Sequence, residues 1–247
     1  MKSRFRSMLL IMINITFVLQ LIFFSSFVDA NTKNAPVEVR LATEMMKSLH
    51  KKGLPYIECV FAKMKRTYKV ISVPWQRAQL GVEKSSYDGF FVASRNENRD
   101  HYAEFSEPFF NIDWLYIATK KSGLTPDDPN FTQKTFAANR GSARLTWLLD
   151  KVENQEITNE VIITTNSFSS VQMLSRGRVD INLENRENFE VALKKTGLPR
   201  SDFKTFIAKS KPVGVYFGNA FLNREPEFLE SFNAGVRVCK EGQLIEP

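Results

Sequence analysis

The chain contains few of the residues on which catalytic and metal sites usually depend. Its 247 residues include two histidines and two cysteines, and His50 and His101 stand in no metal-binding spacing. The sequence has no G-x-S-x-G segment, no cysteine and histidine pattern typical of a nucleophilic site, and no recognisable pair of catalytic carboxylates. We therefore expect no cofactor and no metal ion, and the sequence favours a binding protein over an enzyme.

The sequence also lacks a block of charge of one sign. Its formal net charge is +7, but the 34 basic residues are scattered among 27 acidic ones and do not alternate with aromatic residues. This pattern is typical of an ordinary solvated surface and argues against a nucleic-acid partner. A mildly basic surface would also attract anionic solutes.

The long apolar run of the sequence lies at its N-terminus. Three basic residues precede the largely apolar residues 8–24, and Val28-Asp29-Ala30 has the small-residue ending that a signal peptidase accepts. We expect residues 1–30 to be a signal peptide that is cleaved after Ala30. The alternative is a retained membrane anchor, because the run is almost as long as the roughly 20 residues that a spanning helix needs.

The rest of the sequence alternates between strand and helix patterns. This order is typical of βαβ units and predicts an α/β fold. A turn-rich segment at 120–130 marks a boundary, and the chain after Ala30 is long enough for two lobes of roughly 100 residues each. Strands are predicted at 37–41, 68–73, 89–93, 114–118, 135–138, 161–164 and 179–183, and helices at 57–65, 76–82, 142–151, 167–175 and 185–195.

The most informative segment is residues 73–110. Its apolar run at 89–93 is typical of a strand buried on both faces, as in a parallel sheet. Ser94 and Arg99 follow that run, so we expect them at the carboxyl end of the strand, where ligands usually bind to α/β sheets. The planar guanidinium of Arg99 can bind a carboxylate or phosphate through two parallel hydrogen bonds. The segment predicts an anion-binding site, with a solvated surface arginine as the alternative.

A wider pattern surrounds Arg99. Asp88 stands before the strand, Ser94 and Arg99 stand after it, and Phe105-Ser106 and Pro108-Phe109 come next. This order resembles the signature of bacterial periplasmic solute-binding proteins of the polar amino-acid ABC transporter type, called family 3. In that family, D-(apolar strand)-S-x-T-x-x-R is followed by FS-x-P-[YF].

Three further segments carry the same resemblance. PWQRAQ at 74–79 is similar to a PW-x-R-A variant found in a subset of these proteins. MLSRGRVDINLEN at 173–185 resembles the family's L-x-x-G-R-x-D segment, and residues 214–236 resemble its C-terminal strand and helix. The order of the segments is preserved over most of the chain after Ala30, so the chain resembles a divergent member of the family.

The resemblance implies a two-lobed periplasmic-binding-protein fold of type II. Each lobe would be a mainly parallel sheet flanked by helices, with a ligand cleft between the lobes. Lobe 1 would comprise residues 31–117 and 211–247, and lobe 2 residues 118–210. The crossovers near 116–120 and 209–214 would form the hinge.

The implied function is periplasmic binding of a small polar solute that is anionic or carries a carboxylate. The protein would be a monomer that closes on its solute and delivers it to an inner-membrane ABC permease. One alternative is a ligand sensor that reports to a chemoreceptor or signalling membrane protein. Another is a periplasmic lyase or dehydratase of the same fold, with Glu44, Glu184 or His101 as the acid-base group.

The two cysteines allow a single bridge within the chain. The family resemblance returns the C-terminal segment to lobe 1, which would bring Cys59 and Cys239 together. We therefore expect a disulfide between them, as an oxidising periplasm permits. The alternative is two buried free thiols.

Other residues extend the predicted cleft. Gly141 and Ser142 lie between a predicted strand and a helix, where backbone N–H groups can face an anion; Ser142 can equally be a simple N-cap. Trp75 and Phe91 belong to the same segment as Arg99 and are expected to contact the solute. Two more candidates are Arg77, as a second positive group, and Glu44, near the end of the first strand.

One departure from the family concerns the ligand's α-ammonium group. The family usually places an Asp after the third strand of lobe 2, but this chain has Asn185 there, between Glu184 and Arg186. An asparagine accepts a hydrogen bond but brings no charge. Glu184 is the candidate substitute. The sequence thus supports recognition of an amino acid's carboxylate group and leaves recognition of its α-ammonium group in question.

Overall fold

The computed structural model describes residues 37–44 and 48–242, and the expected signal peptide lies outside them. From Glu38 onward these residues belong to one compact unit. The strands are β1 (Val39–Glu44), β2 (Tyr68–Val73), β3 (Gly89–Ser94), β4 (Ala103–Phe105), β5 (Phe110–Thr119), β6 (Phe136–Asn139), β7 (Val161–Thr164), β8 (Ile181–Asn185) and β9 (Phe203–Gly218).

Helices occupy most of the connections between these strands. The α-helices are α2 (Ser48–Met64), α3 (Trp75–Glu83), α4 (Glu97–Asp100), α5 (Ala143–Glu153), α6 (Ser167–Ser175), α7 (Arg186–Thr196), α8 (Asn219–Leu222) and α9 (Phe228–Glu241). Short 3-10 turns lie at Lys120–Ser122, Phe131–Gln133 and Arg200–Asp202. No helix within the described ranges is both long and apolar enough to cross a membrane.

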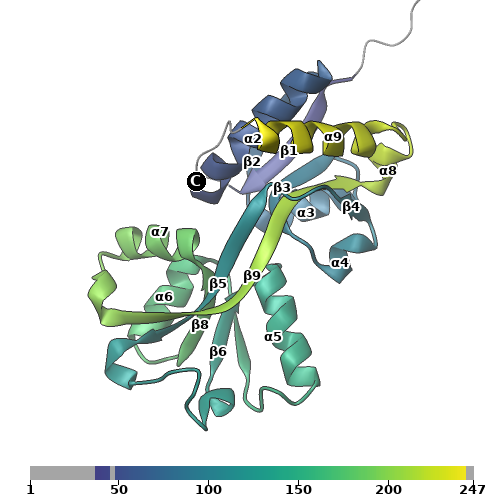
Figure 1. The fold of residues 1–247 in the computed structure, drawn as a ribbon. Helices are drawn as coiled ribbons and strands as arrows, with labels where there is room; N and C mark the ends of the chain where they lie inside the picture. The colour runs from purple at the N-terminus through teal and green to yellow at the C-terminus, as the bar shows by residue number, and fades with distance from the viewer. Residues whose placement is uncertain (1–36, 45–47, 243–247) are drawn as a thin grey trace, which may run out of the picture. The chain divides into compact units, whose positions relative to one another are not determined.

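The strands form a mixed sheet in the order β2-β1-β3-β9-β5-β8-β6-β7, with β4 paired to β9 (Figure 1). One half consists of the parallel strands β2, β1 and β3, and the other of the parallel strands β7, β6 and β8. The antiparallel strands β5 and β9 run from one half to the other. Between the halves, residues 111–113 pair with residues 210–212.

Each half of the sheet has its own covering helices. In Figure 1, α2 and α9 lie beside β1 and β3, whereas α5, α6 and α7 surround β6 and β8. The first half is filled by aromatic side chains, including Phe61, Phe217 and Phe232; the ring of Phe232 lies 5.9 Å from that of Phe61 and 4.8 Å from that of Phe217. Burial of this kind is the main favourable contribution to folding.

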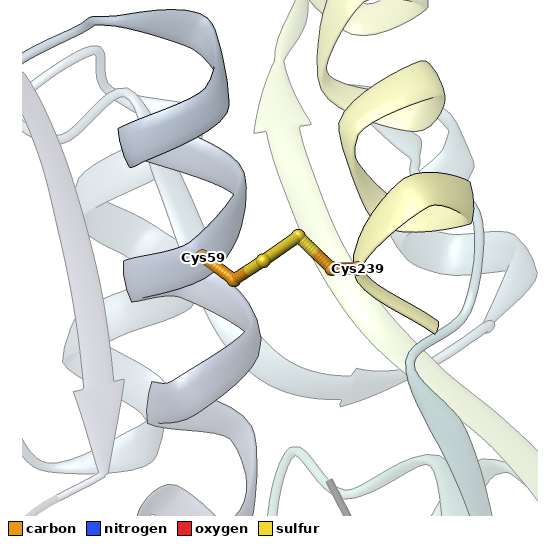
Figure 2. Close-up of a disulfide and its surroundings, with 2 residues drawn as sticks. All are labelled: Cys59 and Cys239. Atoms are coloured by element: carbon orange, nitrogen blue, oxygen red, sulfur yellow. A yellow bond between two sulfur atoms is a disulfide. The ribbon is translucent and has the colours of Figure 1, made fainter. Parts of the chain in front are cut away.

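The expected disulfide is present and joins α2 to α9 (Figure 2). Cys59 and Cys239 are 180 residues apart in sequence, and their Cα atoms are 6.1 Å apart. The two helices approach closely because Gly235 of α9 has no side chain: a Cβ there would lie 2.9 Å from Val60 of α2.

Two expectations about individual elements need correction. The helix predicted at 57–65 begins at Ser48 and contains Pro55. Pro55 has no backbone N–H, so the carbonyl group of Lys51, four residues earlier, loses its helical donor. The strand predicted at 89–93 is fully buried as expected, but it is parallel only to β1 and antiparallel to β9.

Candidate functional site

A cavity of about 370 Å³ lies where the two halves of the sheet face each other. Its volume falls in the range of sites for small molecules. One wall comes from the ends of β1 and β3 with α2, α3 and α4, and the other comes from the first residues of α5, α6 and α7. The lining includes seven residues that the sequence nominated: Arg99, Ser94, Trp75, Phe91, Ser142, Asn185 and Glu44.

Arg99 lies on α4 and is 3% exposed. Its Nε donates to Gln79 (3.0 Å), Nη1 to the carbonyl oxygen of Ser94 (2.7 Å) and Nη2 to that of Gly141 (3.1 Å). The guanidinium also lies 5.3 Å from the ring centre of Trp75. These bonds leave one N–H on each terminal nitrogen, which is enough for one carboxylate.

The positive charge of Arg99 persists in this buried position. Burial lowers the pKa of Arg99 to about 10. The group is therefore still protonated at neutral pH. No carboxylate of the described residues forms an ion pair with Arg99, although the charge of Asp100 acts on it from further away. A buried charge without such a pair is costly, so a ligand that brings a negative group to Arg99 would be favoured.

Gly141 does not line the cavity, but its carbonyl oxygen accepts hydrogen bonds from residues that surround the cavity. That oxygen accepts hydrogen bonds from Trp75 (3.2 Å), Gln79 (3.2 Å) and Arg99. Gly141 has a φ of +69°, and a Cβ there would lie 3.1 Å from Gln76. The residue thus connects the β6–α5 turn to α3 and α4 across the cavity.

Three helices begin at the opposite wall. Ser142, Asn166 and Asn185 line the cavity and are the N-caps of α5, α6 and α7. Their side-chain oxygens accept from backbone N–H groups at 2.8 to 3.1 Å. Because helix N-termini carry partial positive charge, their convergence favours a negative ligand.

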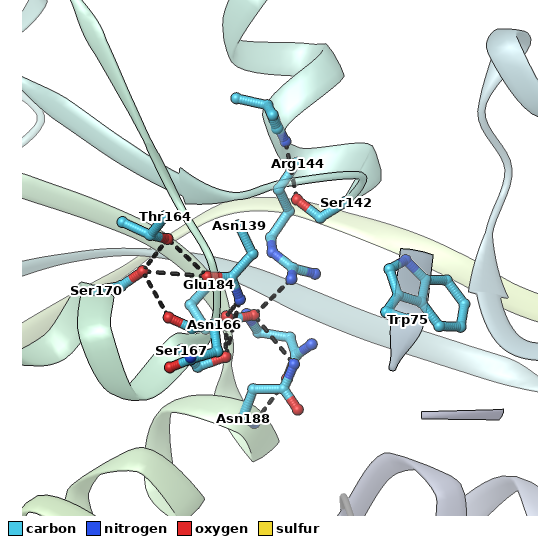
Figure 3. Close-up of polar contacts among 12 residues, drawn as sticks. Trp75, Asn139, Ser142, Arg144, Thr164, Asn166, Ser167, Ser170, Glu184 and Asn188 are labelled. Carbon is cyan, nitrogen blue, oxygen red and sulfur yellow. Dashed lines mark hydrogen bonds and ion pairs between the residues drawn. The ribbon is translucent and has the colours of Figure 1, made fainter. Parts of the chain in front are cut away.

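Glu184 lies beneath this wall and is 1% exposed. Its carboxylate accepts from Ser167 (2.6 Å), Asn139 (2.7 Å) and the backbone of Asn185 (2.8 Å), and it lies 2.7 Å from Nη2 of Arg144 (Figure 3). Both carboxylate oxygens are thus engaged by the protein. The structure does not place Glu184 among the cavity-lining residues.

The remaining nominated residues lie elsewhere. Arg77 is exposed on α3 and lines a separate surface groove that adjoins the cavity at Arg99. His101, a candidate acid-base group, is exposed at the end of α4 and does not line the cavity. Within the described residues, no group of three or more His, Cys, Asp or Glu side chains is placed to hold a metal ion.

Sequence reasoning missed three charged or titratable residues of the lining. Arg140 and Arg144 flank the Gly141-Ser142 pair, and the position of that pair at a helix start was the signal that could have found them. His50 was missed because the first turns of α2 were expected to be a loop. Its ring lies 5.6 Å from that of Phe91, and burial lowers its pKa.

Comparison with known proteins gives structural relatives only. No family model matches the chain, and no curated protein is similar to it. A histidine kinase sensor domain with similarity to periplasmic binding proteins superposes with a TM-score of 0.70 at 11% identity, over 85% of this chain and 93% of that one. A substrate-binding protein of an ABC uptake transporter from Streptococcus pneumoniae, with bound histidine, has a TM-score of 0.67 at 16% identity, over 83% and 87%.

A third similar structure is an ancestral amino-acid-binding protein described as a precursor of cyclohexadienyl dehydratase. Its TM-score is 0.61 at 12% identity, over 83% of this chain and 89% of that one. At such identities these likenesses establish the fold alone. The chain has the two-lobed periplasmic-binding-protein fold that the sequence predicted. Membership of the polar amino-acid family remains a prediction.

Proposed function

We propose that this protein binds a small, carboxylate-bearing solute in the cavity and closes its two lobes around it. The observation that carries the proposal is the charge of the cavity lining. Among the residues that the structure describes, three arginines, Arg99, Arg140 and Arg144, line it together with one carboxylate side chain, that of Glu44. Three helix N-termini add partial positive charge, so the cavity suits an anion.

The lobes that close are nearly those expected from the sequence, residues 31–117 with 211–247 and residues 118–210, but residues 114–117 pair with β8 and so belong with the second lobe. We therefore place the hinge at the paired stretches 111–113 and 210–212, the first of which lies before the crossover expected at 116–120. Closure of two lobes about a hinge of a few residues is a common response to a ligand. Asn96 and Thr146 would meet on closure, as they do here at 2.8 Å.

The proposed location is the periplasm, reached through the signal peptide, and the proposed partner is an inner-membrane ABC permease. A sensory role is the second candidate, because the histidine kinase sensor domain has the same fold over most of both chains. Both roles depend on closure of the two lobes around the solute, because the closed conformation is the state that a membrane partner would recognise.

The test is a thermal-shift and calorimetric screen of the purified, secreted protein against carboxylic acids and their amides of equal length. Binding that occurs only in the folded state raises the melting temperature. We expect carboxylates to raise it and the uncharged amides not to. Equal stabilisation by acids and amides, or by neither, contradicts the proposal.

A further inference from the structure

We infer that the cavity contains a second anion-binding position, built by Arg144 on the wall opposite Arg99, and that the solute is a short dicarboxylate. This inference rests on the proposed function and narrows it to one class of solute. It concerns a residue that lines the cavity from α5, at the point where three helices begin.

Arg144 is buried and only partly bonded. The residue is 8% exposed, and Nη2 lies 2.7 Å from Oε1 of Glu184. Its Nε is buried and has no hydrogen-bond partner among the described residues. Figure 3 shows the side chain extending from α5 toward Glu184, with Trp75 of the opposite wall across the view. A guanidinium has five N–H donors, so a bond to Glu184 leaves donors for a ligand.

Glu184 positions Arg144. Hydrogen bonds from Ser167 and Asn139 hold its other oxygen, Oε2, so the carboxylate cannot turn toward the cavity. An arginine held by a buried carboxylate keeps a fixed direction, which is what bidentate recognition of a second carboxylate requires. The ion pair therefore acts as the support of a binding group.

Arg99 and Arg144 are close enough to influence each other. The lowering of the pKa of Arg99 is due mainly to burial, and the charge of Arg144 adds to it. Two like charges that face one cavity repel each other, and a negative group beside each removes the repulsion. A solute with one acid group at each end satisfies both.

Neighbouring groups suit the same solute. Asn185 uses its side-chain oxygen to cap α7, so its amide nitrogen is the part that remains to donate to a ligand. The hydroxyl of Ser142 accepts from the backbone of Leu145 and keeps its own proton to donate. Ser142 and Asn185 thus both offer a donor on this wall, and the carboxylate that could have held an ammonium group, Glu184, is engaged beneath it.

The experiment compares dicarboxylates with matched compounds that have lost one charge. Succinate, glutarate and adipate are titrated calorimetrically against succinamate, glutaramate and adipamate. We expect at least one dicarboxylate to bind roughly 10- to 100-fold tighter than its monoamide, as a charge-assisted contact predicts. The monoamides keep one acid group and report on the Arg99 position.

Two variants assign the difference to Arg144. Arg144→Gln alone leaves Glu184 buried without its counter-charge and can prevent folding. The double variant R144Q/E184Q replaces the ion pair by two neutral amides, and it should bind dicarboxylate and monoamide equally. Arg176→Gln, at the exposed end of α6, is the control and should keep the preference of the wild type.

The outcomes separate this inference from the proposed function. Equal binding of both compounds by the wild type, or an unchanged preference in R144Q/E184Q, overturns the second position and leaves a single anion site. Failure of the folded wild type to bind any of the six compounds overturns this inference. If carboxylates of every other class also fail in the screen, the proposed function falls as well.

Discussion

Arg99 reaches the cavity from a helix of four residues, and the protein itself accepts three of its hydrogen bonds. A lysine at this position would keep the charge but lose the planar fork that contacts Ser94 and Gly141 at once. Arg99 thus joins the two walls of the cavity, and its remaining N–H groups are the part that we propose to bind the solute.

The first prediction concerns Arg99. Arg99→Ala should abolish the rise in melting temperature caused by a bound carboxylate, and Arg99→Lys should reduce it strongly. Arg77→Ala is the control, because Arg77 is an exposed arginine of the same segment that does not line the cavity. The measurement is thermal shift with and without ligand. A normal ligand response in Arg99→Ala would remove Arg99 from the site.

The second prediction concerns the ion pair of Glu184 and Arg144, whose side chains are 1% and 10% exposed. Glu184→Ala should lower the free energy of unfolding by about 3 to 5 kcal/mol, because it leaves a buried arginine without its partner. Glu190→Ala breaks the exposed pair with Arg200 and should cost at most about 1 kcal/mol. Urea denaturation measures both, and equal losses would contradict this account.

At the scale of elements, the sequence predicts most helices and strands because their local signals agree with the fold. The bounds predicted for β2, β7 and α6 match those observed. The first turns of α2 were missed because Gly53 and Pro55 are poor helix formers, and only packing explains them. Gly53 lies where a Cβ would meet Val92 of β3 at 2.3 Å, and no local pattern reveals such a contact.

The residues around the cavity were also only partly predictable from the sequence. Ser94 and Ser142 were predictable because strand ends and helix starts have recognisable sequences. The partners of Arg99 and Arg144 were not, since Gly141 and Glu184 approach them only when segments more than 35 residues apart in sequence are packed together. Which side chains remain available to a ligand is therefore a tertiary property.

The third prediction concerns the link between α2 and α9. Replacing Cys59 and Cys239 by serine should lower the free energy of unfolding by about 2 to 5 kcal/mol, as measured by denaturant unfolding. Wild-type protein treated with a reductant should behave like the variant. Denatured, unreduced wild-type protein should show no reactive thiol, and finding two would contradict the bridge.

At the scale of the whole molecule, a few contacts join the two walls of the cavity. Three donors from α3 and α4 meet the carbonyl oxygen of Gly141, Asn96 meets Thr146, and Lys52 of α2 meets Glu187 of α7 at 2.7 Å. These contacts need no solute, so under the proposed function they would give the closed arrangement some stability of its own, and a ligand would shift an existing equilibrium.

The fourth prediction tests that equilibrium at Gly141. Gly141→Ala strains a backbone with positive φ and also crowds Gln76 and Gln79, at 3.1 and 3.2 Å. We expect a larger radius of gyration in small-angle X-ray scattering and weaker binding of carboxylates. Gly177→Ala has nearly the same φ, +67°, but no neighbouring atom within 4 Å, so it should lose stability without opening. Identical scattering from both variants would contradict the role of Gly141.

The bridge between Cys59 and Cys239 also makes the chain a covalent ring that encloses both β5 and β9. A protease that cuts one peptide bond anywhere between residues 59 and 239 produces two pieces that stay attached through sulfur. On an unreduced gel the nicked chain would migrate as one species, and only a reductant would release its fragments. Damage to an exposed loop of lobe 2 thus need not detach any part of the protein.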